Sequence, residues 1–219
     1  MKKKNIIFLV LITILIIVVG INIYILYEIN VIPHRKYSNS YFGIDTYVSS
    51  TDYDNDGIDD QSDILSGVRE YINTKPKYKS QYYAGGYSND EYGVCTDVVA
   101  NGLLSAGYDL MELVNSHMEN NRYLYDIERI DKNIDFRRVQ NLKVYFKNTA
   151  VELTTNVDEK EEWQGGDIVI FDRHIGIVSD KRNRNGVPFL IHHANPYQVH
   201  YEEDVLEDRD DIVGHYRIS

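Results

Sequence analysis

The order of helical and strand-like segments predicts an α+β domain behind one apolar N-terminal helix. Apolar residues recur at helical spacing in the first part of the chain, and short β-like runs follow after Asp131. Helices that precede a group of short strands are typical of an α+β fold with an antiparallel sheet. With 219 residues, the chain is long enough for one such domain and a tail, and too short for several.

The composition narrows the classes of protein to which the chain can belong. Lys and Arg number 23 and Asp and Glu 34, and the resulting net charge of -11 disfavours a general electrostatic interaction with nucleic acid. Cys95 is the single cysteine, which excludes an intramolecular disulfide and any site that needs two thiolates. Since 43% of the residues are hydrophobic, the chain can fill a core and is not expected to be disordered.

Residues 1–28 are expected to anchor the chain in the cell membrane. Residues 6–26 are mostly aliphatic, a run of about the length that a helix needs to cross a bilayer. Lys2, Lys3 and Lys4 precede this run, and the positive-inside rule keeps them cytoplasmic. A cleaved secretory signal is the alternative, but the run is longer than a signal core and lacks a small-x-small cleavage site. We therefore expect a single-pass anchor with an extracytoplasmic C-terminal domain.

The remainder divides into three parts with different composition. Residues 29–50 are expected to form a tether, residues 51–70 an Asp-rich loop and helix, and residues 71–219 the main domain. Apolar periodicity predicts helices over 62–73, 94–106 and 110–118. The glycine-containing segment 75–93 is expected to be a loop. Short β-like runs predict strands over 142–146, 168–171, 175–178, 189–192 and 212–218.

Cys95 is a candidate nucleophile because it stands at a helix start. It directly follows the glycine-containing loop and opens the helix predicted over 94–106. Backbone N–H groups and the helix dipole at such a point stabilise a thiolate, which is the reactive form of cysteine. The same N–H groups can hold the oxyanion of a tetrahedral intermediate. The alternative is an inert buried cysteine.

Histidines on the later strands are the candidate partners of this thiol. His174 opens the strand predicted over 175–178, which puts its ring at a sheet edge beside a helix packed on the sheet. His192 and His193 lie on the next strand, and strand alternation sends them to opposite faces, so only one of the two can assist His174. A purely structural role for His174 is the alternative, and Asn195 is a third option for the assisting residue.

Five segments in a fixed order carry a family resemblance. They are Gly93-Val94-Cys95-Thr96-Asp97-Val98-Val99, Asn133-Ile134-Asp135-Phe136-Arg137-Arg138-Val139-Gln140-Asn141-Leu142, Gly166-Asp167-Ile168-Val169, His174-Ile175-Gly176-Ile177-Val178 and Gly214-His215-Tyr216-Arg217. Together they resemble the domain of unknown function 1287, which is similar to NlpC-type papain-like cysteine peptidases. The resemblance implies a papain-like fold in which a helix-borne nucleophile packs on an antiparallel sheet that carries the histidine base.

The resemblance also assigns roles to three residues. Cys95 falls on the nucleophile, His174 on the base and His192 on the third position, which orients the ring of the base. The implied reaction is attack of a thiolate on an amide or ester carbonyl, with His174 as the imidazolium that keeps the thiolate ionised. Such a reaction uses no metal or organic cofactor. NlpC-type peptidases usually have Asp where this chain has Val94.

Location and resemblance together suggest a function. We expect a membrane-anchored extracytoplasmic cysteine hydrolase, an amidase or peptidase, with a cell-wall peptide or a protein as substrate and no nucleic-acid partner. A non-catalytic, calcium-stabilised module that binds the wall or a protein is the first alternative. The second is an acyl transferase that uses the same residues and passes the acyl group to an amine.

Residues 52–63 have the spacing of a calcium-binding loop. Gly57 stands at the sixth loop position, and carboxylates stand at the first, third, fifth, ninth and twelfth, as Asp52, Asp54, Asp56, Asp60 and Asp63. Calcium needs about six to eight oxygen ligands around a sharp turn. The segment resembles EF-hand and related loops, in which such an ion would be structural. The alternative is a solvated acidic turn that caps the following helix.

Arg137 and Arg138 are candidate substrate-binding residues. A guanidinium group can bind a carboxylate through two hydrogen bonds, as a peptide stem or terminus would require. The alternative is an internal pair with Asp135 that fixes the loop. His215 and Arg217 in the last predicted strand are open to the same two interpretations.

Overall fold

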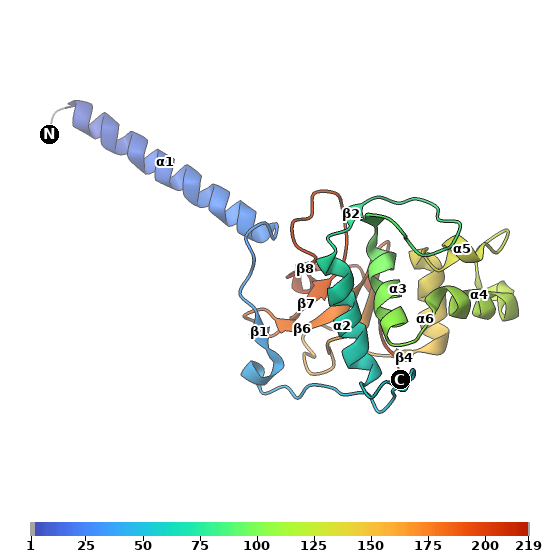
Figure 1. Ribbon diagram of the computed structural model, residues 1–219. Helices are drawn as coiled ribbons and strands as arrows, with labels where there is room; N and C mark the ends of the chain where they lie inside the picture. The colour runs from blue at the N-terminus through green and yellow to red at the C-terminus, as the bar shows by residue number, and fades with distance from the viewer. Residues whose placement is uncertain (1–2, 219) are drawn as a thin grey trace. The chain divides into compact units, whose positions relative to one another are not determined.

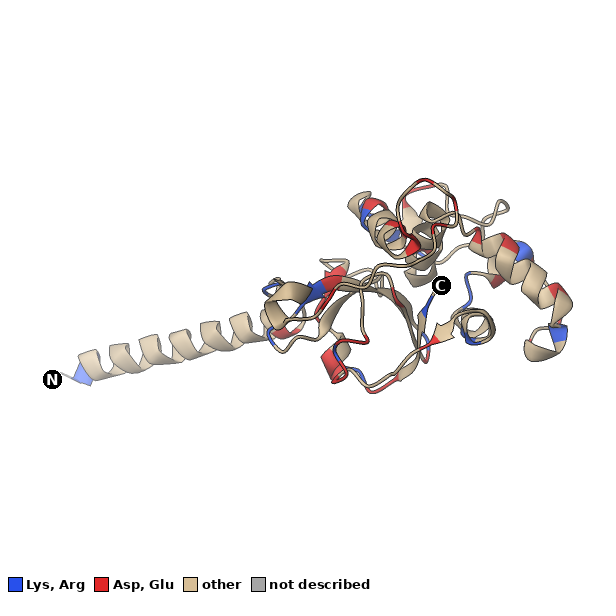
Figure 2. Cartoon of the chain, turned by 90° about the horizontal axis from the view of Figure 1, so that it is seen from below, with Lys and Arg blue, Asp and Glu red and all other residues tan. Residues whose placement is uncertain are grey.

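The computed structural model describes residues 3–218, which form two compact units divided after His34. The first unit contains helix α1 (Lys3–Glu28), which is long and apolar enough to cross a membrane. Its charged residues are Lys3, Lys4 and Glu28, and the ribbon in Figure 2 is blue only at the start of the helix. Lys2, which belongs to the predicted cytoplasmic lysines, lies outside the described residues.

Polar residues inside α1 do not interrupt its apolar character. The Thr13 hydroxyl donates to the Leu9 carbonyl oxygen at 3.0 Å, and the Asn22 amide donates to the Val18 carbonyl oxygen at 2.8 Å. Because a bilayer offers no other partners, such bonds within the helix lower the cost of placing these groups in hydrocarbon. The described helix therefore has the features of a single-pass anchor.

The second unit, from Arg35 onward, is a mixed α+β domain with one main sheet. Its α-helices are α2 (Asp60–Asn73), α3 (Cys95–Ser105), α4 (Leu110–Asn120), α5 (Lys132–Asp135) and α6 (Val139–Thr149). Short 3-10 helices cover Asn39–Phe42, Arg122–Leu124 and Leu206–Asp208. The strands are β1 (Tyr37–Ser38), β2 (Lys77–Tyr78), β3 (Tyr92–Gly93), β4 (Val151–Glu152), β5 (Ile168–Phe171), β6 (Ile175–Arg182), β7 (Pro188–Ile191), β8 (Glu202–Glu203) and β9 (Ile212–Arg217).

The main sheet is antiparallel, as the sequence predicts. Its strands follow the order β4-β9-β5-β6-β7-β8, and β1 pairs with the far end of β6. Strands β2 and β3 form a separate parallel pair. Helices α2 and α3 lie side by side on one face of the sheet, as Figure 1 shows, and α3 contacts β6 directly.

Alternation along the strands buries both faces of the sheet. Five isoleucines point toward the helices and join the main core: Ile168, Ile170, Ile175, Ile177 and Ile191. The intervening Val169, Phe171, Val178 and Leu190 pack with Trp163 in a second core on the opposite face. Residues at the ends of β6 and β7 can therefore be assigned to one face or the other.

Helices α2 and α3 approach closely because each presents a glycine to the other. A Cβ at Gly67 would stand 2.1 Å from the Ser105 hydroxyl oxygen, and one at Gly102 would stand 2.4 Å from Val68 Cγ1. In this arrangement, the first turn of α3 packs against the start of β6. Cys95 is the first residue of that turn.

Three parts of the chain differ from the sequence-based expectations. The segment 75–93, expected to be a loop, contains β2 and β3, which pair with each other in parallel. The strand predicted over 142–146 is wrong, because these residues belong to α6. Leu142, Tyr145 and Phe146 are buried at helical spacing and outweigh the strand preference of the local composition. The segment 29–50, expected to be a tether, contains β1, in which Tyr37 and Ser38 pair with Arg182 and Lys181.

Candidate active site

The first turn of α3 is fixed by a buried ion pair. Asp97 accepts a hydrogen bond from the Val94 backbone N–H at 2.8 Å, which caps the helix just before Cys95. Arg137 donates to both oxygens of the same carboxylate, from Nε and Nη2, each at 2.8 Å. Both side chains are almost completely buried, so the position of Cys95 depends on this pair.

The two predicted substrate-binding arginines lie in different environments. The remaining guanidinium nitrogen of Arg137 donates to the Gln81 carbonyl oxygen at 2.7 Å, so all its nitrogens have partners within the chain. Arg138 contacts Asp135 at 3.1 Å, and 51% of its side chain is exposed. Substrate binding stays a prediction for both residues, and only Arg138 presents a guanidinium to solvent.

A chain of hydrogen bonds links the two candidate histidines to a glutamate. His174 Nε2 lies 2.8 Å from His192 Nδ1, and His192 Nε2 lies 3.0 Å from a carboxylate oxygen of Glu203. The antiparallel pairing of β6 with β7 and of β7 with β8 brings these three residues together. His192 and Glu203 are buried, whereas His174 is partly exposed. Sequence analysis missed Glu203, since nothing in its spacing distinguishes it from Glu202.

The hydrogen bonds from His174 to His192 and from His192 to Glu203 determine the tautomer of His174. An ionised Glu203 has no hydrogen to donate, so His192 Nε2 donates to it and His192 Nδ1 accepts. His174 Nε2 then donates to His192, which leaves His174 Nδ1 with a free lone pair. The arrangement prepares His174 to accept a proton.

Cys95, the first residue of α3, lies next to the start of β6, which directly follows His174. The backbone N–H of Ile175, the residue after His174, is close enough to act on the thiol. Burial raises the pKa of Cys95 to about 11, and the N–H groups of Ile175 and Thr96 act in the opposite direction. Among the described residues, the side-chain hydrogen bond of His174 runs to His192 and not to Cys95.

The protonation states of Cys95 and His174 differ from those of a thiolate-imidazolium ion pair. Burial lowers the pKa of His174 and of His192 to about 3, and the proximity of His192 contributes to the shift of His174. These pKa values favour a neutral thiol and a neutral imidazole at neutral pH. The thiolate-imidazolium pair expected from the sequence is not the resting form that these pKa values favour. Burial also raises the pKa of Glu203, to about 7.

His193 and Asn195, the other options for the third position, point elsewhere. The His193 ring packs edge-on against Tyr78 and Tyr201, with centroid distances of 5.2 and 5.1 Å. The Asn195 side chain accepts a hydrogen bond from the Tyr197 backbone N–H at 2.8 Å. The structure thus brings His192, rather than either alternative, to His174.

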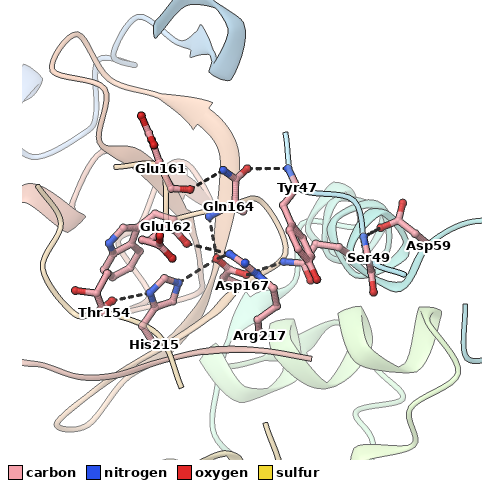
Figure 3. Close-up of polar contacts among 12 residues, drawn as sticks. Tyr47, Ser49, Asp59, Thr154, Glu161, Glu162, Gln164, Asp167, His215 and Arg217 are labelled. Carbon is pink, nitrogen blue, oxygen red and sulfur yellow. Dashed lines mark hydrogen bonds and ion pairs between the residues drawn. The ribbon is translucent and has the colours of Figure 1, made fainter. Parts of the chain in front are cut away.

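His215 and Arg217 belong to a separate buried cluster around Asp167, drawn in Figure 3. Arg217 donates from Nε and Nη2 to the two oxygens of Asp167, each at 2.7 Å, and His215 Nε2 lies 3.0 Å from the same carboxylate. The Gln164 backbone N–H also donates to Asp167, at 2.8 Å. This cluster joins β9 to the start of β5. Its contacts agree with the interpretation that His215 and Arg217 form internal pairs.

The acidic loop brings together part of the predicted calcium ligands. Asp52, Asp54 and Asp56 each offer an oxygen within 4.8 Å of the others. Asp60 does not join them: its oxygens accept from the Tyr53 backbone N–H at 2.8 Å and from the Tyr108 hydroxyl. The ninth loop position therefore faces the protein rather than the loop centre.

Comparison with known proteins places these residues in a family. The family model described as Domain of unknown function (DUF1287) matches residues 65–218. The chain belongs to the DUF1287 family. Cys95, His174, His192 and Glu203 all lie within the matched residues, and the acidic loop precedes them.

A relative and a search of solved structures complete the comparison. The chain is 38% identical over 167 residues to the uncharacterized protein YijF of Escherichia coli (strain K12). The match covers 70% of this chain and 80% of the relative. No solved structure matches the chain. Neither the description of the DUF1287 family nor that of its relative states an activity.

Proposed function

We propose that this DUF1287 protein is a membrane-anchored, extracytoplasmic cysteine hydrolase with a papain-like, NlpC-like fold. Its substrate would be an amide bond, in the peptide part of the cell wall. The observation that carries the proposal is the hydrogen-bonded chain His174–His192–Glu203, which lies beside a thiol at a helix N-terminus. A nucleophile, a base and a group that orients the base are the parts that acyl transfer from an amide requires.

The neutral resting pair assigns the first proton transfer to His174. As the Cys95 sulfur attacks the carbonyl carbon, Nδ1 of His174 accepts the thiol proton, and backbone N–H groups at the start of α3 stabilise the oxyanion. The imidazolium then protonates the leaving amine as the C–N bond breaks, which leaves a thioester on Cys95. Water, deprotonated by His174, attacks the thioester and releases a carboxylic acid and the free thiol.

Cleavage of wall peptides by the full chain in detergent tests the proposal. We expect release of peptide fragments by the wild type, loss of release in Cys95→Ala, and a loss of at least about 100-fold in His174→Ala because a general base is removed. Asn195→Ala, which changes an exposed residue outside the hydrogen-bonded chain, is the matched control and keeps wild-type activity. Equal release by wild type and Cys95→Ala contradicts the proposal.

One observation favours a non-catalytic binding module instead. The raised pKa of Cys95 and the lowered pKa of His174 are opposite to those of an activated thiol. Two measurements distinguish the functions. The first is iodoacetamide alkylation of Cys95 against pH in the presence of wall peptides, from which a hydrolase is protected because its thioester forms on Cys95. The second is peptide binding by Cys95→Ala, which equals that of the wild type if the protein is a binding module that leaves Cys95 unused.

The acyl transferase would use the same residues with a different acceptor. It is separated from the hydrolase by adding a primary amine to the cleavage assay. A transferase joins the amine to the new acyl end, and a hydrolase yields the free carboxylic acid.

A further inference from the structure

The acidic loop before α2 concentrates negative charge in a small space. The carboxylates of Asp52, Asp54 and Asp56 come within 4.8 Å of one another. Among residues 3–218, none of the three forms an ion pair with Lys or Arg, and their hydrogen bonds come from backbone N–H groups of the loop itself. Like charges held at this distance repel one another, and a bound cation would relieve that repulsion.

A fourth carboxylate, from the first turn of α2, supplies independent evidence. Asp63 is only 7% exposed, and its Oδ2 atom is buried without a hydrogen-bond partner. The carboxylates of Asp56, Asp54 and Asp52 are the charges that act most strongly on Asp63, so Asp63 lies next to the loop. An unpaired buried carboxylate is costly, and a bound cation would supply its missing partner.

The neighbouring acidic residues have other roles, which defines the ligand set. Asp59 caps α2 by accepting from the Ser62 backbone N–H at 3.3 Å, and it also accepts from the Ser49 backbone N–H at 2.9 Å. Both oxygens of Asp60 have partners in the protein. Four carboxylates, from Asp52, Asp54, Asp56 and Asp63, remain for a cation.

We propose that Asp52, Asp54, Asp56 and Asp63 bind one calcium ion. Hard oxygen ligands of this kind suit Ca²⁺, which takes about six to eight of them, with backbone carbonyl oxygens and water completing the shell. Magnesium fits less well, because it demands strict octahedral geometry and releases its water reluctantly. The site is independent of Cys95 and lies before the family-matched residues, so it survives if the proposed hydrolase activity fails.

Contacts of the loop with the helices indicate what the ion does. Tyr53 stacks on Tyr108 with a centroid distance of 4.3 Å, and Asp54 packs against Gly107, where a Cβ would stand 2.8 Å from the Asp54 Cβ. Gly107 has a φ of +80°, which favours glycine at this contact. Calcium in the loop would therefore connect the start of α2 to the turn between α3 and α4, and so stabilise the domain.

Calcium binding by the full chain in detergent tests the site, with the protein first treated with a chelator. Titration with CaCl₂ is expected to give one bound ion per chain, and a saturating excess is expected to raise the thermal unfolding midpoint by about 5 °C or more. Asp56→Asn and Asp63→Asn should each weaken binding by at least about tenfold, because each removes a charged ligand. Asp158→Asn, which also changes an exposed aspartate but outside the loop, is the matched control and binds as the wild type.

Asp63→Asn has a second readout that separates ligand loss from misfolding. In chelator, the variant should unfold at or above the wild-type temperature, because it removes a buried carboxylate oxygen that has no partner. A lower midpoint in chelator would mean that Asp63 has a stabilising partner within the chain, and this overturns the site. An unchanged wild-type midpoint on adding CaCl₂, or an equal shift with MgCl₂, overturns it as well.

Discussion

At the residue scale, Glu203 is the group on whose ionisation the proposed mechanism depends. The ionised carboxylate can only accept from His192, and this direction leaves Nδ1 of His174 free to accept a proton; a protonated Glu203 can donate instead and no longer fixes that direction. Its pKa of about 7 lies above the ordinary glutamate value of 4.5 because the side chain is buried. The proposed activity should therefore rise as the pH passes through about 7.

Glu203→Gln tests this dependence. We expect the variant to lose the rise in activity near pH 7, measured as a pH profile of kcat/KM. Burial raises the pKa of Glu203 in the folded state. The wild type therefore loses stability as the pH rises from 4.5 to about 7, and the variant does not. Urea unfolding at pH 5 and pH 8 measures that difference.

Glu202→Gln is the matched control on the adjacent residue. Glu202 forms ion pairs with Lys36 and Arg69, and these partners hold its pKa below the usual value although burial acts to raise it. Its contribution to stability is present at neutral pH and is lost on acidification, the reverse of Glu203. A pH profile that changes in Glu202→Gln and not in Glu203→Gln would contradict the role given to Glu203.

Glu203 also marks a limit of sequence-based reasoning at this scale. Cys95 could be found because a lone thiol follows a glycine-containing loop at a helix start, and His174 because it opens an apolar strand. Glu203 lies in a two-residue strand whose pairing depends on the β6–β7 hairpin. No local pattern shows which of two consecutive glutamates faces His192.

At the scale of elements, the buried pair of Asp97 and Arg137 connects α3 to the segment before α6. Asp97 caps α3, and Arg137 is held in turn by the Gln81 carbonyl oxygen. Removing one partner of a buried pair leaves the other charge uncompensated in a medium that solvates it poorly. The start of α3, and with it Cys95, should therefore lose order when Arg137 is replaced.

Arg137→Met is expected to lower the free energy of unfolding by about 3–5 kcal/mol. Arg138→Met, which removes the half-exposed neighbouring arginine, should cost no more than about 1 kcal/mol. Urea denaturation followed by circular dichroism measures both values. Similar losses in the two variants would show that the Asp97 pair does not have the stabilising role inferred from its burial.

The elements found from sequence carry a clear local signal. The predicted helix over 62–73 coincides with α2 because its apolar residues recur at helical spacing. The predicted strands over 168–171 and 175–178 coincide with β5 and the start of β6 because each is a short run rich in β-branched residues. Residues 142–146 were misassigned because Val144, Tyr145 and Phe146 have high strand preference, and only the wider spacing of buried residues shows a helix. The two-residue strands depend on tertiary pairing and leave no local signal.

At the scale of the whole molecule, the proposed substrate depends on which side of the membrane the domain occupies. Helix α1 has basic residues at its start, and the positive-inside rule predicts that these residues stay in the cytoplasm. The proposed function requires this orientation, because the domain would then lie where wall peptides are found. The acidic composition of the chain gives the domain little attraction to an anionic membrane surface, so the proposed attachment depends on α1.

Replacing Lys2, Lys3 and Lys4 together by Glu tests this orientation. In intact cells from which the wall has been removed, added protease should digest the domain of the wild type, and a larger share should be protected in the triple variant. Lys143→Glu with Lys147→Glu, which changes lysines of the second unit, is the control and leaves the wild-type pattern. If the wild-type domain is protected until the cells are lysed, it lies inside the cell. A wall-peptide substrate would then be out of reach, although the chemistry proposed for Cys95 and the calcium site would still stand.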